Sequence, residues 1–233
     1  MNYSKYLYAK GTVIKFTDTD QLDRLEQNIK LYPELETRTV NYTINSLGFR
    51  GKEWQKSGGV MSLGCSMTFG VGVDDREVWP YIISEKLGLE NYNLGQGGAG
   101  PDTAFRLASF YISRLLPSYV IYLEPPSSRI ELLDYEGKSI VLSSQIHADY
   151  KDYYTTYASN RLNQYLNQLR NRHALRQLCQ EHGSKFYHFT WKDIDYKNQE
   201  AQSLGRDLMH PGRGHHLNFA KQVLKVLDPA AQL

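Results

Sequence analysis

Cysteine is scarce in this chain of 233 residues, and long apolar runs are missing. The two cysteines, Cys65 and Cys179, do not make the disulfide framework of a small secreted domain, so reduced thiols are expected. No run of 18 apolar residues occurs, which predicts that no segment spans a membrane. The opening stretch, MNYSKYLYAKGTVIKF, lacks the apolar core of a secretory signal. We therefore expect a cytoplasmic protein.

An excess of charge of one sign is also missing. The formal net charge is +2, which is too small to predict a nucleic-acid-binding surface. The hydrophobic share of 41% is that of an ordinary globular protein, and the length suits one sizeable core. Tyrosine is abundant instead, with 18 residues, and the segment 149–166 (DYKDYYTTYASNRLNQYL) predicts an aromatic, partly exposed surface.

Strand and helix patterns alternate after residue 50. Short apolar stretches predict strands at 59–64, 91–95, 119–124 and 185–191, and apolar residues at helical spacing predict helices at 77–89, 101–116, 155–183 and 214–227. This alternation predicts an α/β fold with a parallel sheet covered on both faces. We expect residues 51–233 to form this domain. Residues 1–50, with extended stretches at 11–20 and 38–49, are expected to form an N-terminal extension packed on it.

Ser66 follows a buried strand in VMSLGCSMTFGVGV (60–73). Glycine and serine are common where strands end, so the serine has an ordinary explanation. A tight turn from a strand into a helix also holds a nucleophile beside exposed backbone amides. Ligands of parallel sheets bind beyond the carboxyl ends of the strands, where Ser66, the glycines of 95–98 and residues 124–129 are predicted to lie.

A base for this serine is found among the seven histidines. His147, His173, His182 and His188 lie in a loop, a helix or a strand, where structural or solvent-facing roles are expected. His210 lies in the loop RDLMHPGRGHH, three residues after Asp207. That spacing allows the carboxylate to reach one imidazole nitrogen, while the other nitrogen stays free for a serine.

These loops also suggest two other ligands. Asp207, His210, His215 and His216 together suggest a metal site. The side chains of the adjacent His215 and His216 diverge, however, and both are expected to begin the last helix, so no metal is predicted. The loop GQGGAG (95–100) suggests phosphate binding, but it fits no dinucleotide fingerprint, and close backbone approach to an oxyanion explains its glycines better.

Three segments resemble the first, second and last blocks of the SGNH/GDSL hydrolases: GCSMTFGVGV, NLGQGGAGPDT and RDLMHPGRGHH. INSLGFRG (44–51) resembles a segment often found ahead of the serine block. The resemblance implies a three-layer α/β/α fold with a mostly parallel, flavodoxin-like sheet, and ester hydrolysis without a cofactor. It further implies Ser66 as nucleophile, Asp207 and His210 as acid and base, and the amides of Ser66 and Gly98 as the oxyanion hole.

The chain departs from this family in two places. Cys65 stands where the family has an aspartate outside the catalytic triad, which leaves Cys65 as a second, less favoured nucleophile. The third block, which usually supplies an asparagine, reads YVIYLE followed by PPSSRIE. Ser127, Ser128 or Arg129 takes the place of that oxyanion donor, or the loop only turns the chain while Arg129 pairs with Glu131 or another carboxylate.

These observations predict a serine hydrolase that cleaves a carboxylic ester through an acyl-enzyme. The expected substrate is a small ester or an acylated carbohydrate. If it is an acetylated carbohydrate, the protein is a carbohydrate O-deacetylase. The alternative is a catalytically weak or inactive protein of this fold that binds a glycan or serves a structural role in a larger assembly. The missing asparagine is the main support for that alternative. The sequence does not indicate an oligomeric state.

Overall fold

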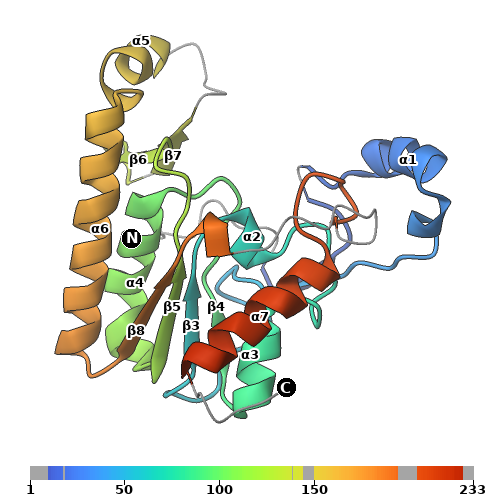
Figure 1. The fold of residues 1–233 in the computed structure, drawn as a ribbon, viewed down its shortest axis with the longest axis horizontal. Coiled ribbons are helices and arrows are strands. Elements are labelled where there is room, and N and C mark those ends of the chain that lie inside the picture. Colours follow the sequence, from blue (N-terminus) through green and yellow to red (C-terminus); the bar gives the residue numbers. More distant parts are fainter. Residues whose placement is uncertain (1–9, 18, 138, 144–149, 194–203, 228–233) are drawn as a thin grey trace.

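A four-stranded parallel sheet forms the centre of the protein (Figure 1). The computed structural model describes residues 10–17, 19–137, 139–143, 150–193 and 204–227. The strand order is β4–β3–β5–β8, from β4 (Asn91–Asn93), β3 (Val60–Leu63), β5 (Tyr119–Leu123) and β8 (Lys185–Phe189). All three strand pairs are parallel.

Two helices cover each face of this sheet. Helices α3 (Trp79–Leu87) and α7 (Arg213–Leu227) enclose one buried apolar cluster, in which the rings of Trp79 and Phe219 meet edge to face at 5.2 Å. Helices α4 (Pro101–Leu115) and α6 (Arg161–Glu181) enclose a second cluster, which includes Leu107 and Leu175. The arrangement confirms the predicted three-layer α/β/α fold.

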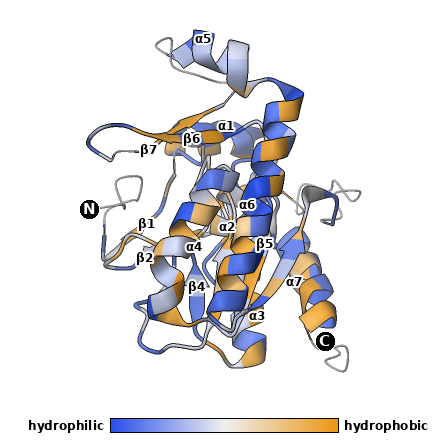
Figure 2. Cartoon of the chain, turned by 90° about the vertical axis from the view of Figure 1, so that its left-hand side faces the viewer, coloured by the Kyte–Doolittle hydropathy of each residue, from blue (hydrophilic) through white to orange (hydrophobic). Residues whose placement is uncertain are grey.

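The predicted start of the long helix at residue 155 is wrong. Helix α6 begins at Arg161, because the side chain of Asn160 accepts hydrogen bonds from the amides of Leu162 and Asn163 and caps it. A short helix, α5 (Lys151–Tyr153), and a π-helical turn, η3 (Tyr154–Ala158), precede it. Figure 2 shows hydrophilic residues along α6, which accords with a helix that buries only a narrow face.

An antiparallel hairpin that the sequence did not predict follows β5. It consists of β6 (Ile130–Leu133) and β7 (Ser139–Leu142). Leu142 packs against Tyr154 and Ala158 in a small separate cluster. The hairpin therefore buries its apolar residues against the segment that leads into α6, and not against the main sheet.

The N-terminal segment runs through β1 (Thr12–Ile14), α1 (Leu22–Leu31), the 3₁₀ turn η1 (Pro33–Leu35) and β2 (Tyr42–Ile44). Strands β1 and β2 pair antiparallel, and a bridge between Arg50 and Asn93 joins this region to β4. The buried Arg50 guanidinium pairs with Asp75 and donates to the carbonyls of Phe69 and Gly70. The segment thus contacts the loops around α2 (Ser66–Phe69).

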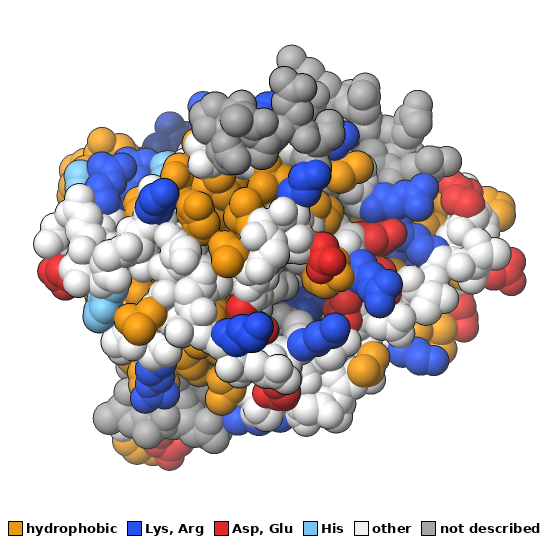
Figure 3. Space-filling model, turned by 90° about the horizontal axis from the view of Figure 1, so that it is seen from below, with side chains coloured by type: hydrophobic (Ala, Val, Ile, Leu, Met, Phe, Trp, Pro, Cys, Tyr) orange, Lys and Arg blue, Asp and Glu red, His pale blue; other side chains and the backbone are white. Residues whose placement is uncertain are grey.

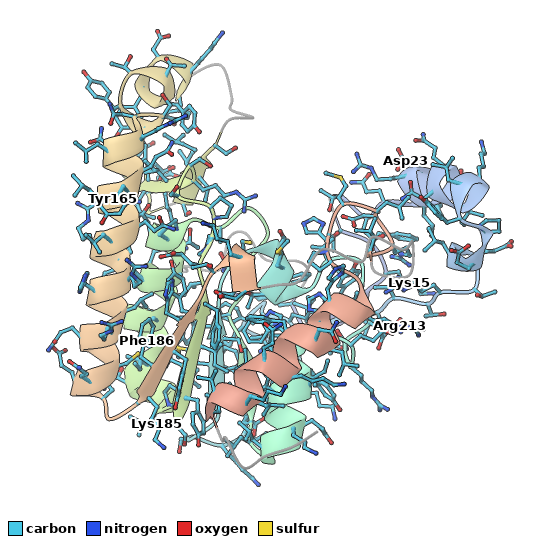
Figure 4. The ribbon with its side chains drawn as sticks, viewed as in Figure 1. Lys15, Asp23, Tyr165, Lys185, Phe186 and Arg213 are labelled. Atoms are coloured by element: carbon cyan, nitrogen blue, oxygen red, sulfur yellow. The ribbon has the colours of Figure 1, made fainter. Side chains whose placement is uncertain are left out.

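The face opposite the carboxyl ends of the strands carries mixed charge. Figure 4 labels Lys185 at the start of β8, at the lower end of the sheet, and Figure 3 views the molecule from that side. Lysine and arginine are interspersed there with acidic and hydrophobic side chains (Figure 3). Among the helices in the described part of the chain, none is long and apolar enough to cross a membrane.

Candidate active site

Ser66 is the first residue of the short helix α2, which directly follows β3 at the carboxyl edge of the sheet. Cys65 precedes it in an extended conformation, so the chain turns sharply from strand to helix. The loop after β4 lies directly against α2, and a Cβ atom on Gly95 would come within 2.3 Å of the Phe69 nitrogen. Glycine at position 95 therefore allows the two segments to meet at this edge.

Three side chains from two segments far apart in the sequence form a continuous series of hydrogen bonds. The Ser66 Oγ lies 2.9 Å from Nε2 of His210. The other ring nitrogen of His210, Nδ1, lies 2.6 Å from Oδ2 of Asp207. The Asp207 side chain is fully buried and that of His210 is 14% exposed. The structure thus brings together the three residues that the sequence motifs single out.

The loop before α7 explains why Asp207 and His210 meet. Oδ1 of Asp207 accepts hydrogen bonds from the backbone amides of Met209 and His210, each at 3.1 Å, which bends the segment into a tight turn. The Gly205 amide donates to the carbonyl of His210 at 2.7 Å and closes the loop. The three-residue spacing therefore places Oδ2 beside the imidazole ring.

The environment of Asp207 favours its charged form. Burial raises the pKa of this carboxyl. The hydrogen bond and charge of His210, together with the two backbone amides, lower the pKa by more than burial raises it. The net effect is a pKa below the ordinary value. A charged carboxylate beside Nδ1 fixes the proton on that nitrogen and leaves Nε2 as an acceptor for the serine proton.

The neighbouring histidines are structural in this arrangement. His215 and His216 are buried in the first turn of α7, and Nδ1 of His216 accepts a hydrogen bond from the Trp79 amide at 3.3 Å. Burial lowers the pKa of His216 to about 3. Within the described ranges, no three His, Cys, Asp or Glu side chains are grouped so that they would hold a metal ion.

The remaining histidines lie apart from Ser66. His173 is exposed on α6 and His182 follows the last turn of that helix. His188 lies on β8, with Nε2 at 3.2 Å from Oε2 of Glu124. His147 falls outside the described residues.

Both cysteines lie in the hydrophobic core. Cys65 is buried in the cluster that includes Trp79 and Phe219, beneath the turn that presents Ser66. Cys179 is buried on the other face, and burial raises the pKa of its thiol to about 12. The placement of Cys65 in the core disfavours it as the nucleophile.

Gly98 lies in a turn that is tied to the end of β3. The Ala99 amide donates to the carbonyl of Gln96, and the Gln96 amide donates to the carbonyl of Gly64, both at 3.2 Å. Gly98 has a φ of 75°, a conformation that glycine adopts without strain. This turn holds the backbone of residue 98 close to the segment that carries Ser66.

The three residues considered as the third oxyanion donor are placed differently. Nη1 of Arg129 lies 3.5 Å from the carbonyl oxygen of Ala99, next to Gly98. In the described residues, no hydrogen bond links the side chains of Ser127 and Ser128 to Ser66 or Gly98, and the Ser128 carbonyl accepts from the Tyr154 hydroxyl.

The alternative pairing of Arg129 with Glu131 is wrong. Two nitrogens of Arg106 bind the Glu131 carboxylate, each at 2.8 Å, and the Ser139 hydroxyl also donates to it. Arg106 lies on α4 and Glu131 on β6, and the two residues are 25 positions apart in the sequence. The sequence did not indicate this pairing. The hydrogen bond that the structure describes for the Arg129 guanidinium goes to the Ala99 carbonyl, next to Gly98.

Comparison with known proteins gives similarity in structure only. The sequence matches no protein-family profile and no curated protein. Among solved structures, a protein assigned to the G-D-S-L lipolytic family from Desulfitobacterium hafniense DCB-2 is 13% identical, with a TM-score of 0.40 over 72% of this chain and 98% of that one.

Two further solved structures show a comparable level of similarity. Esterase EstA from Pseudoalteromonas sp. is 11% identical, with a TM-score of 0.39 over 73% of this chain and 96% of that one. The α/β hydrolase LAE5 from the metagenome of Lake Arreo is 13% identical, with a TM-score of 0.39 over 76% of this chain and 99% of that one.

The N-terminal extension supplies contacts that the sequence did not indicate. The Thr19 hydroxyl donates to Oδ2 of Asp207 at 3.0 Å, and Asp20 pairs with Arg206, the residue before Asp207. Thr19 and Asp207 are 188 positions apart. No motif or spacing in the sequence connects residues at such a distance, so only the folded chain reveals this contact.

Proposed function

We propose that this protein is a serine hydrolase that cleaves carboxylic esters through an acyl-enzyme. The observation that carries the proposal is the series Ser66 Oγ, His210 Nε2 at 2.9 Å, and His210 Nδ1 to Asp207 Oδ2 at 2.6 Å. A nucleophile within hydrogen-bond reach of a base, with an acid that orients the base, is the arrangement that acyl transfer requires. We propose Ser66, His210 and Asp207 in those roles.

The reaction proceeds in two halves. In the first, Nε2 of His210 takes the proton of Ser66 while Oγ attacks the ester carbonyl carbon. The tetrahedral intermediate collapses as His210 gives that proton to the leaving alcohol oxygen, and the carbon–oxygen bond breaks. In the second half, His210 takes a proton from water, the hydroxide attacks the acyl carbon, and Ser66 leaves as the alcohol with the proton returned.

The negative charge on the carbonyl oxygen needs donors that are already in place. In the proposal these are the backbone amides of Ser66 and Gly98. Arg129 is the proposed third donor, because its guanidinium lies at the carbonyl of Ala99, one residue from Gly98. A charged donor forms a stronger hydrogen bond to an oxyanion than a neutral one.

The substrate is proposed as a small ester, with acylated carbohydrates as the first class to examine. A fluorophosphonate probe and a panel of short acyl esters and O-acetylated sugars test the proposal. The wild-type protein should be labelled and should turn over at least one ester. The Ser66→Ala variant should lose both the labelling and the ester turnover.

Ser109→Ala is the matched control, because Ser109 is exposed on α4 and, within the described residues, its hydroxyl binds the Phe105 carbonyl one turn earlier. That variant should be labelled at the wild-type rate. Labelling that survives Ser66→Ala and disappears in Cys65→Ala would show that Cys65, and not Ser66, is the nucleophile. Absence of both labelling and turnover in the wild type would refute the proposed hydrolysis and favour a binding role.

A further inference from the structure

The Asp207 carboxylate accepts four hydrogen bonds from the described residues, two at each oxygen. Oδ1 accepts from the amides of Met209 and His210. Oδ2 accepts from Nδ1 of His210 and from the Thr19 hydroxyl. Three of these donors belong to the same loop as the carboxylate, and the fourth comes from the N-terminal extension.

The extension also holds the backbone on which Asp207 is mounted. The Asp20 carboxylate binds Nε and Nη2 of Arg206 at 2.9 and 2.6 Å, and both side chains are buried. The side-chain Nδ2 of Asn28 donates to the Arg206 carbonyl at 3.1 Å. Nη2 of Arg206 donates to the Lys15 carbonyl, and Figure 4 shows Lys15 on the same side of the molecule as Arg213 at the start of α7.

In Figure 1, the loop that leads into α7 lies between that helix and the extension carrying α1. Opposite charges joined by two parallel hydrogen bonds resist rotation as well as separation. The Asp20–Arg206 pair therefore sets Thr19 and Asp207 in one fixed register, because each is the chain neighbour of one partner.

From this geometry we infer that Thr19 is a positioning residue, which holds Oδ2 of Asp207 against Nδ1 of His210. The inference rests on the proposed function for its effect on the rate. Among the described hydrogen bonds, none joins Thr19 to Ser66, so Thr19 acts through the carboxylate. Its hydroxyl occupies the remaining acceptor site of Oδ2, so the carboxylate keeps its orientation and water has no place beside it.

Two substitutions separate the hydroxyl from the bulk of the side chain. Thr19→Val keeps the shape and removes the donor, whereas Thr19→Ser keeps the donor and removes a methyl group. Thr37→Val is the matched control, because Thr37 lies in the same extension and its exposed hydroxyl donates to the Glu34 carbonyl, away from Asp207. Each full-length variant is assayed for the fluorophosphonate labelling rate of Ser66, for kcat and KM, and for the proton resonance of His210 Nδ1.

We expect Thr19→Val to lower the labelling rate and kcat about tenfold, the effect of one hydrogen bond to a charged group, with little change in KM. The Nδ1 resonance should move. Thr19→Ser should restore the rate and the resonance, and Thr37→Val should leave both at wild-type values. Wild-type kinetics and an unmoved resonance in Thr19→Val would overturn the inference, as would a Thr19→Ser variant as slow as Thr19→Val.

The resonance keeps this test separate from the hydrolase proposal. If the wild type neither labels nor turns over an ester, the proposed function fails, yet the Nδ1 proton still reports on the Asp207–His210 contact. A shift in Thr19→Val that Thr19→Ser reverses then supports positioning by Thr19, and an unmoved resonance refutes it. Thr19→Ala serves in place of Thr19→Val if valine prevents folding.

Discussion

Two buried carboxylates in this protein face a histidine, one in the loop before α7 and one directly after a strand of the main sheet. Asp207 lies 2.6 Å from Nδ1 of His210, and Glu124, which follows β5, lies 3.2 Å from Nε2 of His188. Asp207 and Glu124 are both at least 97% shielded from solvent. By residue type and burial alone, the two pairs are equivalent candidates for an acid–base unit.

Their hydrogen bonds differ. Both oxygens of Asp207 are fully occupied, whereas in the part of the chain that the structure describes Oε1 of Glu124 has no hydrogen-bond partner. The contact between Glu124 and His188 is within ion-pair distance without the geometry of a hydrogen bond, and Arg172 approaches only to 4.0 Å. A carboxylate beside a histidine is therefore not sufficient; a fixed orientation and a nucleophile on the second nitrogen distinguish the Asp207 pair.

The largest expected contrast is between the two histidines. His210→Ala removes the proposed base and should lower kcat by about 10⁴–10⁶-fold, while His188→Ala should stay within about twofold. Ser66→Ala combined with His210→Ala should be little worse than either alone, because residues that act as a unit lose their effect together. Equal losses in His210→Ala and His188→Ala would remove the distinction between the pairs.

Exchange of each carboxylate for an amide should give the next largest contrast. Asp207→Asn keeps the size but loses the charge that fixes the proton on Nδ1, so kcat should fall about 10³–10⁴-fold. Glu124→Gln should leave kcat unchanged. Steady-state kinetics on one ester measures both, and a Glu124→Gln variant as impaired as Asp207→Asn would place Glu124 in the catalytic unit.

Arg129 tests whether a side chain completes the proposed oxyanion hole. If its guanidinium reaches the oxyanion, Arg129→Ala should lower kcat about 10²-fold, the typical effect of one lost donor. Arg114→Ala is the control, because Arg114 lies on the outer part of α4 over the Phe110 ring. An Arg129→Ala variant with wild-type kcat would leave the two backbone amides as the whole oxyanion hole and imply a slow enzyme.

The smallest expected effect is on stability, and it concerns His216, which is buried and whose Nε2 has no hydrogen-bond partner in the described part of the chain. The pKa of His216 is lowered from 6.5 to about 3, so the unfolded chain binds a proton in this range and the folded chain does not. The stability from neutral His216 is complete above pH 6.5 and is lost as the pH falls toward 3. Each pH unit should cost about 1.4 kcal/mol in the free energy of unfolding.

Denaturant unfolding at several pH values measures this slope. His216→Gln keeps an acceptor for the Trp79 amide and removes the titration, so its unfolding free energy should depend less on pH between 6 and 4. His173→Gln, at an exposed position of α6, should leave the slope as in the wild type. An unchanged slope in His216→Gln would show that the imidazole is charged inside the folded protein.

The main sheet and its helices were predictable because their signals are local. Apolar stretches of four or five residues and helical spacing of apolar residues predict β3, β5, α4 and α7 closely. The hairpin β6–β7 was missed, because its apolar residues pack on Tyr154 and Ala158 and not on the main sheet. The start of α6 was misplaced because the residues before the Asn160 cap are also helical, so the sequence pattern shows no boundary there.

The sequence by itself determined which residues are candidates for the site: Ser66 from its place after a buried strand, and Asp207 and His210 from their spacing within one loop. These inferences needed only short-range geometry. The tertiary structure alone decided that Arg106 and not Arg129 holds Glu131, that Cys65 lies in the core, and that Thr19 contacts Asp207. The physical reason is that packing and hydrogen bonds between distant segments depend on how the whole chain is folded, and no periodicity or spacing along the sequence records them.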